Sequence, residues 1–575
     1  MAVLTAAVCL FAGGTIGLAR DSLPQLQLTA EAANTYIGAA YGLQLEYEEL
    51  EDGTVEITKF VSSSSTDIEL PSVIDGKSVT SIGYRAFNAY DIEACSNLTS
   101  IVIPDNVVSI GNYAFRGCAS LADVTIPDSV ISIGNSAFED CTSLTNVTIP
   151  DSVISIGEHA FSGCTNLTAV TIPDSVMSIG DSAFNECSNL SEFIVDSNNK
   201  LYASKDGALF DKNLETIICC PGGKAGNFII PDSVTSIGDS AFWGCINLTS
   251  VMIPDGVTSI GNGAFLDCTS LTNMIIPNSV TSIGNAAFLD CTSLTNIMIP
   301  DSMTSIGERA FSFSSLTDVM IPDSVTSIGD AAFKCCGNLA TVIIPDSVTS
   351  IGNSLFDGCV SLTDVTIPDS VTSIGYDAFQ FCTSLTSITI PDSVTSIGYR
   401  AFYHCTSLTD VTISDSMISI GGRAFSECIS LIDVTIPDSV TSIGYDAFRY
   451  CTGLTNVTIP DSVTSIGDSA FFSCDNLTDI YYKGTESKWN EISIGSSAIP
   501  SNVTIHYESE PVTTTTTTTT TTKPITTMTS TTTITKPITT TTTISEDTVA
   551  YGDVNTDNVV DLRDTIVLNK YLANI

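Results

Sequence analysis

The sequence predicts a solenoid of repeated coils, mainly β, in which a parallel β-sheet runs along the array and short helical or 3-10 turns connect its strands. Two observations predict this fold. The segment "IPDSVTSIGDSAFWGC" at 230–245 recurs in near-copies through most of the 575 residues, usually at a step of 23, as Pro127, Pro150 and Pro173 show. The composition is 43% hydrophobic but only 15% charged, which suits a core buried between neighbouring coils.

A secretory leader is predicted over residues 1–32. The first residues, "MAVLTAAVCLFAGGTIGLAR", are apolar and rich in small side chains but short for a membrane span, which is typical of a signal peptide. Ala30-Glu31-Ala32 offers a cleavage site, and Gly17-Leu18-Ala19 is the alternative. We expect export, with no membrane span after the signal is removed.

Residues 42–70 are predicted to form an N-terminal cap hairpin. Two β-prone runs flank Asp52-Gly53, a dipeptide that favours a tight turn. An array needs such a cap because its first coil would otherwise expose an apolar face and an unpaired strand edge.

The repeat array is predicted over residues 71–480, with the unit LxxVxIPxxVxxIGxxAFxxCxx. Leu144, Val147 and Ile149 have the spacing of a short strand that points three apolar side chains inward. Pro150 ends strand pairing because it has no N–H to donate, and Gly157 allows a bend toward the AF dipeptide that follows. Each coil therefore turns once and returns to the sheet.

This unit resembles the leucine-rich repeats of the bacterial BspA-like surface proteins, also described as the Treponema type. Sixteen copies of the Phe-centred half carry the resemblance, which covers roughly residues 42–506. A β-hairpin insertion at about 196–228 is of a kind familiar from the same family. A C-terminal cap follows at 481–508, where Trp489 is expected to plug the open end of the core, and carbohydrate stacking by Trp489 is the alternative.

Fifteen of the 19 cysteines occupy one column of the repeat, from Cys95 to Cys474. This column is not expected to bind metal, because thiols 23 residues apart lie in single file whereas zinc needs four ligands around one point. We expect free thiols packed in the inner turn, where leucine-rich repeats commonly place Asn or Cys. Cys219 and Cys220 in the hairpin are expected to be the more reactive pair.

The charge balance excludes one class of partner. Lys and Arg number 20 and Asp and Glu number 64, a net charge of −44, so nucleic acid is not expected to bind. One Asp per repeat supplies much of the excess, as a solubilising edge or, alternatively, as a cation or partner site. We expect no enzyme, because the three histidines have no partnered nucleophile or carboxylate and no phosphate loop follows a strand.

Aromatic residues gather at variable, outward positions of the later repeats and are the candidate ligand-binding residues. They are Tyr376, Phe381, Tyr399, Tyr403, Tyr445 and Tyr450. Aromatic rings one coil apart, about 5 Å by sheet spacing, would suit a protein or glycan ligand, and simple drift among duplicated repeats is the alternative. The sheet face offers polar residues instead, namely Asp123, Asn146, Asp364, Asp410 and Asp433.

Beyond the cap, a Thr-rich linker is predicted at 509–547 and a small α-helical calcium-loop module at 551–575. In "DVNTDNVVDLRD", oxygen ligands fall at positions 1, 3, 5, 7, 9 and 12 of a calcium loop. These ligands are Asp553, Asn555, Asp557, the Val559 carbonyl, Asp561 and Asp564.

This loop, the following "TIVLNKYLANI" and the Thr-rich linker together resemble the first half of a type I dockerin. The resemblance implies calcium as cofactor, a cohesin domain of a scaffold protein as partner, and cohesin contacts by Leu562 and Arg563. Asn558 stands where glycine is usual, and the sequence ends at Ile575 before the second loop and helix that dockerins normally carry. A longer reading frame is therefore expected, and a degenerate loop without binding activity is the alternative.

These features predict a secreted, extracellular or cell-surface-associated protein that is not catalytic. It would bind or adhere through its repeat surface to an unknown protein or glycan, and its dockerin would attach it to a cohesin-bearing, cellulosome-like scaffold. The alternative is an accessory or catalytic component of polysaccharide degradation, because dockerins usually accompany carbohydrate-active domains.

Overall fold

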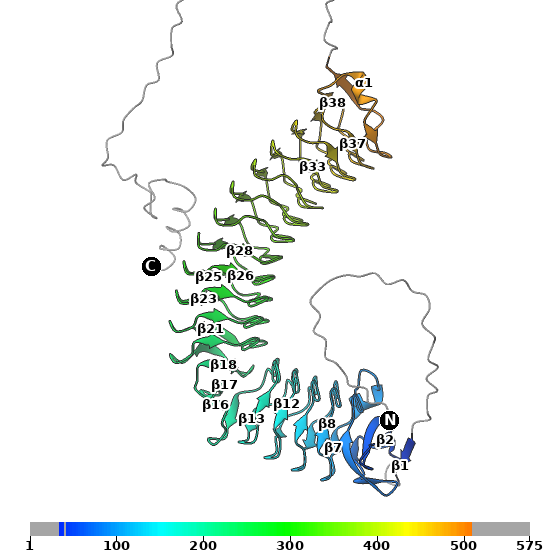
Figure 1. Cartoon of the computed structure of the whole chain (residues 1–575), viewed down its shortest axis with the longest axis vertical. Helices are drawn as coiled ribbons and strands as arrows, with labels where there is room; N and C mark the ends of the chain where they lie inside the picture. The colour runs from blue at the N-terminus through cyan, green and yellow to red at the C-terminus, as the bar shows by residue number, and fades with distance from the viewer. Residues whose placement is uncertain (1–33, 39–41, 509–575) are drawn as a thin grey trace, which may run out of the picture.

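The computed structural model describes residues 34–38 and 42–508, which form a bent solenoid of stacked coils (Figure 1). The predicted solenoid with parallel strands is confirmed. The leader, the Thr-rich linker and the calcium-loop module, predicted at 1–32, 509–547 and 551–575, lie outside the described residues.

Each coil contributes two short strands, so that two parallel ladders run along the array. The first strand lies in the LxxVxI segment, as in β9 (Asp123–Thr125), and the second in the Ser-Ile dipeptide before the repeat glycine, as in β10 (Ser132–Ile133). β9 pairs with β7 (Ser100–Val102) and β10 with β8 (Ser109–Ile110), both in parallel. The second ladder was not predicted from the sequence.

The first ladder also contains β4 (Asp67–Glu69), β11 (Val147–Thr148), β13 (Ala169–Ile172), β15 (Glu192–Val195), β19 (Gly226–Ile229), β21 (Leu248–Met252), β23 (Asn273–Ile275), β25 (Asn296–Met298), β27 (Asp318–Met320), β29 (Thr341–Ile343), β30 (Asp364–Thr366), β31 (Ser387–Thr389), β32 (Asp410–Thr412), β34 (Asp433–Thr435), β36 (Asn456–Ile459), β38 (Asp479–Tyr482) and β40 (Thr504–Tyr507).

The second ladder also contains β6 (Lys77–Ile82), β12 (Ser155–Ile156), β14 (Ser178–Ile179), β18 (Thr216–Cys219), β20 (Ser236–Ile237), β22 (Ser259–Ile260), β24 (Ser282–Ile283), β26 (Ser305–Ile306), β28 (Ser327–Ile328), β33 (Ser419–Ile420), β35 (Ser442–Ile443), β37 (Ser465–Ile466) and β39 (Ser493–Ile494). Isolated parallel bridges such as Ile351 with Ile374 continue it between β28 and β33.

The AF segments are hydrogen-bonded turns rather than the short helices that the sequence suggested. In the described residues, helix is limited to the 3-10 helix η1 (Glu93–Asn97) and the α-helix α1 (Glu486–Trp489). Most of these turns hold two residues in the left-handed conformation, such as Ser136 at φ 54° and Asp140 at φ 60°. A right-handed helix cannot continue through such residues, and this explains the difference.

The first coil is covered by a strand hairpin. β2 (Gln44–Glu49) and β3 (Val55–Ser62) pair antiparallel, and Gly53 in their turn has φ 82°, where a side chain would be strained. β1 (Asn34–Ile37) extends this hairpin, β3 pairs in parallel with β6, and β5 (Val73–Ile74) also pairs with β6. The second ladder therefore starts on a paired edge.

A stack of phenylalanine rings fills the centre of the core. The rings of Phe138 and Phe161 lie 5.3 Å apart with their planes 6° from parallel, and the same arrangement repeats from coil to coil. The stack runs from Phe87 to Phe184 and resumes from Phe242 to Phe471.

The hairpin insertion interrupts this stack and divides the array. β16 (Tyr202–Lys205), β17 (Ala208–Asp211) and β18 pair antiparallel, and β18 then pairs in parallel with β20. The first ladder stops at β15 and restarts at β19, and the buried residues fall into two core clusters that meet at the hairpin. Figure 1 shows the array changing direction at β16–β18. We call residues 42–195 the N-terminal limb and residues 226–508 the C-terminal limb.

Trp489 closes the far end of the core. It ends α1, is 7% exposed, and packs edge-on against Tyr482 and Tyr507 at ring distances of 5.1 and 6.3 Å. The buried ring offers no face to a sugar, so the alternative of carbohydrate stacking is wrong.

The column cysteines are buried and their thiols are free. Burial raises the pKa of Cys95 to about 12, which keeps the thiol protonated and unreactive. Cys219 and Cys220 are 6% and 3% exposed, so the expectation that this pair is the more reactive one is wrong. Among the cysteines of the described residues, Cys335 is the one that is partly exposed.

Candidate functional site

One edge of the solenoid is formed by the turns that run from the repeat glycine to the column cysteine, as in residues 375–382. We call it the AF edge. Ala378 and Phe379 point into the core, and the flanking Asp377 and Phe381 both have left-handed backbone, at φ 55° and 58°. The side chains that flank the AF dipeptide therefore project from this edge.

Arginine is confined to this edge in the part of the chain that the structure describes. The six arginines there are Arg85, Arg116, Arg309, Arg400, Arg423 and Arg449. Tyrosine is also frequent, at Tyr84, Tyr90, Tyr113, Tyr376, Tyr399, Tyr403, Tyr445 and Tyr450. In a chain with a net charge of −44, one edge thus has a distinct composition of tyrosine and arginine.

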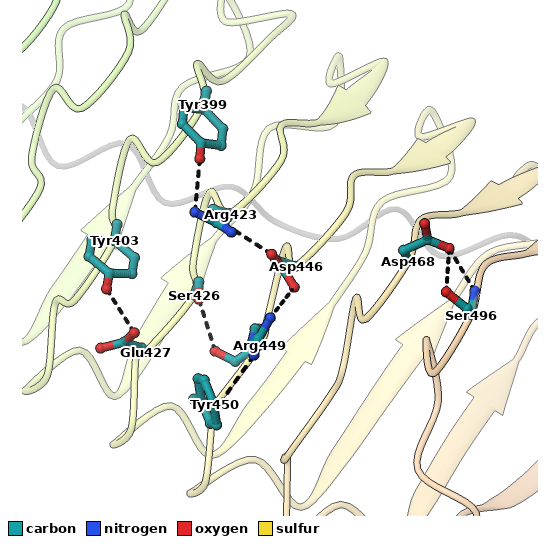
Figure 2. A network of polar contacts seen from close by, with 10 residues as sticks. All are labelled: Tyr399, Tyr403, Arg423, Ser426, Glu427, Asp446, Arg449, Tyr450, Asp468 and Ser496. Atoms are coloured by element: carbon teal, nitrogen blue, oxygen red, sulfur yellow. Dashed lines mark hydrogen bonds and ion pairs between the residues drawn. The ribbon is translucent and has the colours of Figure 1, made fainter.

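A chain of hydrogen bonds links three coils of the C-terminal limb (Figure 2). Arg423 donates from Nη1 to the Tyr399 hydroxyl at 3.1 Å and from Nε to Asp446 at 3.0 Å. Arg449 donates to the other Asp446 oxygen at 3.1 Å and to the Tyr450 hydroxyl at 3.2 Å. Asp446 is 5% exposed, so this buried carboxylate holds both guanidinium groups and, through them, two tyrosines.

A second contact, also drawn in Figure 2, fixes Tyr403. Its hydroxyl donates to Glu427 at 2.7 Å, and the Nδ1 atom of His404 lies 2.8 Å from the other Glu427 oxygen. Partial burial acts to raise the pKa of Glu427, but the hydrogen bonds from Tyr403 and His404 outweigh it and the pKa is lowered. Glu427 is therefore a carboxylate at neutral pH.

The structure brings most of the predicted aromatic residues into contact. Phe381 packs edge-on against Tyr403 at 5.5 Å, and the rings of Tyr399 and Tyr445 lie 5.9 Å apart. Tyr376, Tyr399 and Tyr445 line one surface depression together with the bare backbone of the repeat glycines. Tyr450 instead packs against Phe472, a residue that the sequence analysis missed.

Arginines cover several of these rings. Arg400 lies 4.8 Å from the Tyr399 ring centre and 5.6 Å from that of Tyr403, and Arg449 lies 4.8 Å from that of Tyr450, within the range of cation–π attraction. The six predicted aromatics, with Arg400, Arg423, Arg449, His404, Glu427, Asp446 and Phe472, are called the tyrosine–arginine patch below. The sequence analysis missed the charged members because it searched for aromatic residues alone.

Two patch residues occupy strained backbone positions. Phe381 and Tyr450 have φ 58° and 59° at the position before the column cysteine, where other coils carry glycine, as at Gly117, or another residue in the same conformation, as at Asp140 and Asp290. A bulky residue in this conformation costs about 1–3 kcal/mol. The same left-handed backbone recurs at this position in most coils, so it belongs to the repeat turn and does not distinguish the patch.

The N-terminal limb carries a smaller cluster of the same composition, which the sequence analysis also missed. Arg85 lies 5.2 Å from the Tyr84 ring centre and 5.3 Å from that of Tyr113, while Arg116 lies 5.1 Å from that of Tyr90. The signal was present in the sequence, because the hexapeptide IGYRAF occurs at both 82–87 and 397–402.

Other predicted sites divide into exposed residues and residues outside the described range. Asp123, Asn146, Asp364, Asp410 and Asp433 are exposed on the first ladder. The calcium ligands Asp553, Asn555, Asp557, Val559, Asp561 and Asp564, and the cohesin contacts Leu562 and Arg563, lie outside the described residues. Within residues 34–38 and 42–508, no group of three or more His, Cys, Asp or Glu side chains is arranged to hold a metal ion, and no helix is long and apolar enough to cross a membrane.

Comparison with known proteins identifies the repeat. The family model described as "BspA type Leucine rich repeat region (6 copies)" matches residues 90–215, 219–339, 326–452 and 372–499, which is more than half of the chain. The search of curated proteins found no significant match.

Several solved structures are similar. A leucine-rich repeat protein from Bacteroides ovatus is 27% identical over 81% of this chain and 98% of its own, with a TM-score of 0.39. A leucine rich cell surface protein from Faecalibacterium prausnitzii is 28% identical over 80% of this chain and 98% of its own, with a TM-score of 0.37. The pneumococcal vaccine antigen PcpA is 19% identical over 66% of this chain and 98% of its own, with a TM-score of 0.43.

Proposed function

The chain belongs to the BspA-type leucine-rich repeat family, and on that premise we propose that it is an exported, cell-surface-associated binding or adhesion protein. Its ligand site would be the tyrosine–arginine patch of the C-terminal limb. The observation that carries the proposal is that, among the residues the structure describes, every arginine and many tyrosines lie on the AF edge of a strongly acidic chain. Tyrosine and arginine are among the residue types enriched at interfaces and at their energetic hot spots.

The patch is also built to bind without rearrangement. Tyr399 and Tyr450 are held at both ends of the Arg423–Asp446–Arg449 chain, and Tyr403 is held by Glu427. Tyrosines fixed in this way lose little conformational entropy when a ligand covers them. Pre-organisation of this kind favours a recognition surface over a purely structural network.

Arg400 supplies free hydrogen-bond donors beside the rings. Its guanidinium lies over Tyr399 and Tyr403, and within the described residues it forms no ion pair or hydrogen bond. A planar guanidinium next to aromatic rings suits a carboxylate-bearing protein or glycan. The ligand is therefore proposed to combine a flat apolar face with an acidic group.

The proposal is tested by screening the protein against an array of purified glycans and host extracellular-matrix proteins. For any ligand found, the double variant Tyr399→Ser, Tyr403→Ser is expected to bind at least tenfold more weakly. Tyr84→Ser is the matched control, because it changes the same position of an identical hexapeptide in the other limb. Equal binding by the wild type and the double variant would reject the patch.

A polysaccharide-hydrolysis screen addresses the rival function. The alternative role in polysaccharide degradation predicts turnover of at least one plant or microbial polysaccharide. Binding without turnover supports a non-catalytic protein, whereas reproducible release of sugars from purified material would replace the binding proposal with a catalytic one.

Docking to a scaffold is a separate part of the proposal, and its support is the sequence of residues 551–575. Six oxygen ligands in a calcium-loop spacing, followed by a short amphipathic segment, favour a calcium-dependent contact with a cohesin domain. Leu562 and Arg563 would make that contact.

A further inference from the structure

An apolar stripe crosses the sheet face of the C-terminal limb, away from the AF edge. Eight coils place Thr at the outward strand position just before the Ile-Pro or Ile-Ser pair, as Thr125 and Thr366 do. Six successive coils replace it by Ile or Met, and these residues form the stripe: Ile229, Met252, Ile275, Met298, Met320 and Ile343.

The first four residues of the stripe are exposed and paired in one sheet, and the half-buried Met320 and Ile343 pair with each other in the next sheet. Ile229 pairs with Met252, Met252 with Ile275 and Ile275 with Met298 in the register of β19, β21, β23 and β25. Ile229, Met252, Ile275 and Met298 are 57%, 57%, 70% and 48% exposed. A contiguous apolar row of this kind on an otherwise acidic protein marks an interaction surface.

Carboxylates border the stripe on one side. Asp232, Asp255, Asp301, Asp323 and Asp346 follow the repeat prolines and are exposed, and none of them forms an ion pair within the described residues. Ile229, Met252, Asp232 and Asp255 line one surface depression together. On the other side, two residues earlier in each strand, stand Asn227, Ser250, Asn273, Asn296, Asp318 and Thr341, of which only Asp318 is charged.

This arrangement selects a partner with a cationic side and an apolar side. A second copy of the chain is disfavoured, because two stripes in contact would bring the carboxylate rows of two chains of net charge −44 together. Methionine side chains adapt to partners of irregular shape and are frequent on helix-binding surfaces. A partner with lysine or arginine beside its apolar face complements both the stripe and its acidic border.

The length of the stripe matches a helix. Five steps of about 4.8 Å between neighbouring strands give roughly 24 Å, which is the length of an α-helix of about 16 residues at 1.5 Å per residue. We propose that the stripe docks a cationic amphipathic helix of a partner protein. This inference is independent of the ligand proposed for the tyrosine–arginine patch, which lies on a different edge.

The test uses the full chain and a fluorescent 18-residue peptide of leucine and lysine, patterned to form an amphipathic helix. Binding is measured by fluorescence anisotropy for the wild type and for the triple variant Met252→Thr, Ile275→Thr, Met298→Thr. Thr is the residue that eight other coils carry at this position, so the variant is expected to fold, and thermal unfolding followed by circular dichroism checks this. We expect at least tenfold weaker binding by the triple variant.

Matched controls separate the stripe from general attraction to an acidic protein. A scrambled peptide of the same composition should bind the wild type and the triple variant equally. The double variant Tyr399→Ser, Tyr403→Ser should bind the amphipathic peptide as the wild type does. If the triple variant misfolds, the single change Ile275→Thr replaces it, with an expected threefold loss.

Three results would overturn the proposal. One is equal affinity of the wild type and the triple variant for the amphipathic peptide. Another is equal binding of a leucine–glutamate peptide, which would remove the role of the acidic border. The last is a dimer seen by sedimentation of the wild type and lost in the triple variant, which would assign the stripe to self-association.

Discussion

The thiol of Cys141 donates a hydrogen bond to the main-chain carbonyl of Phe115 in the preceding coil, with Sγ and O 3.2 Å apart. The same contact recurs from Cys118 to Phe87 and from Cys474 to Phe448, each at 3.1 Å. Where Ser314 takes the place of the cysteine, its hydroxyl lies 3.2 Å from the Cys336 thiol. The column therefore consists of small hydrogen-bonding side chains that tie each coil to its neighbour.

Thiol labelling of the native protein should be strongest at Cys335. Burial raises the pKa of the column thiols, that of Cys95 to about 12, and excludes reagent from them, whereas Cys335 is partly exposed. Peptide mapping after brief alkylation at pH 8 would measure this, and denatured protein should label throughout the column. The control Cys335→Ser should lose the native signal at that peptide, and rapid native labelling of the column would contradict the assignment.

Gly398→Ala should destabilise the array by about 1–3 kcal/mol through overpacking. A Cβ atom at this position would lie 2.4 Å from the carbonyl carbon and oxygen of Gly375, and this backbone cannot move aside without separating two coils. Gly337→Ala is the control, because its Cβ would meet only Val360 at an ordinary 3.8 Å. Urea unfolding measures both variants, and a similar midpoint for the two would show that the coils can separate.

Glu186→Gln should raise the melting temperature at pH 7 and leave it unchanged near pH 3. Burial first, and then the charges of Asp267 across the bend and of Asp140 and Glu139 on the same limb, raise the pKa of Glu186. An acid whose pKa is raised by folding destabilises the folded state when ionised, and this penalty disappears as the pH falls below the folded pKa.

The rise in melting temperature is expected to be small, because Glu186 is an exposed residue. Glu158→Gln, at an exposed position on the same limb, serves as the control and should show no comparable rise. An equal gain for Glu186→Gln at both pH values would argue that the charge is not responsible.

Asp446→Ala should cost about 2 kcal/mol of unfolding free energy, because it removes hydrogen bonds between a buried carboxylate and two charged donors. It should also weaken the binding of any ligand to the patch, because Arg423 and Arg449 would no longer hold Tyr399 and Tyr450. Asp438→Ala is the control, because Asp438 is 77% exposed in its pair with Lys483 and such pairs contribute about 0–1 kcal/mol. If chemical denaturation showed that Asp446→Ala and Asp438→Ala lose the same unfolding free energy, Asp446 would have no special structural role.

Calcium binding to the tail should depend on Asp553. Titration calorimetry of the full chain should show one calcium site that is absent from Asp553→Ala and retained in Asp547→Ala, which lies outside the loop. Cohesin capture should then require calcium and be lost with a chelator. Identical heats for the wild type and Asp553→Ala would leave the loop without a role in calcium binding.

The strands of the first ladder could be predicted because they depend on local spacing. Leu144, Val147 and Ile149 are all buried, as their spacing indicated. The second ladder could not, because Ser132 and Ile133 form a strand of two residues that is defined only by the neighbouring coil. The bend was also not predicted, since the loss of pairing between β15 and β19 depends on how the hairpin packs rather than on its composition.

The candidate site was predicted in part for a similar reason. Outward aromatic residues can be found by reading one column of the repeat, and Tyr399 and Tyr403 were found in this way. The role of Asp446 was missed because only aromatic residues were searched, although its partner Arg423 stands in the same column one repeat earlier and its partner Arg449 is three residues later. Such a network becomes visible only when neighbouring coils are placed side by side.

Because each coil adds a fixed step along the solenoid, the number of repeats sets the distance between the bend and the tyrosine–arginine patch. Deleting one whole 23-residue unit between the bend and the tyrosine–arginine patch would bring the patch about 4.8 Å closer to the bend, while every remaining coil would meet a neighbour of the same kind. The 22-residue step around Ser314 shows that even a coil one residue shorter keeps its place in the second ladder. Gain or loss of whole units in the gene would therefore change the position of the ligand site along the solenoid. The contacts within the site would stay the same.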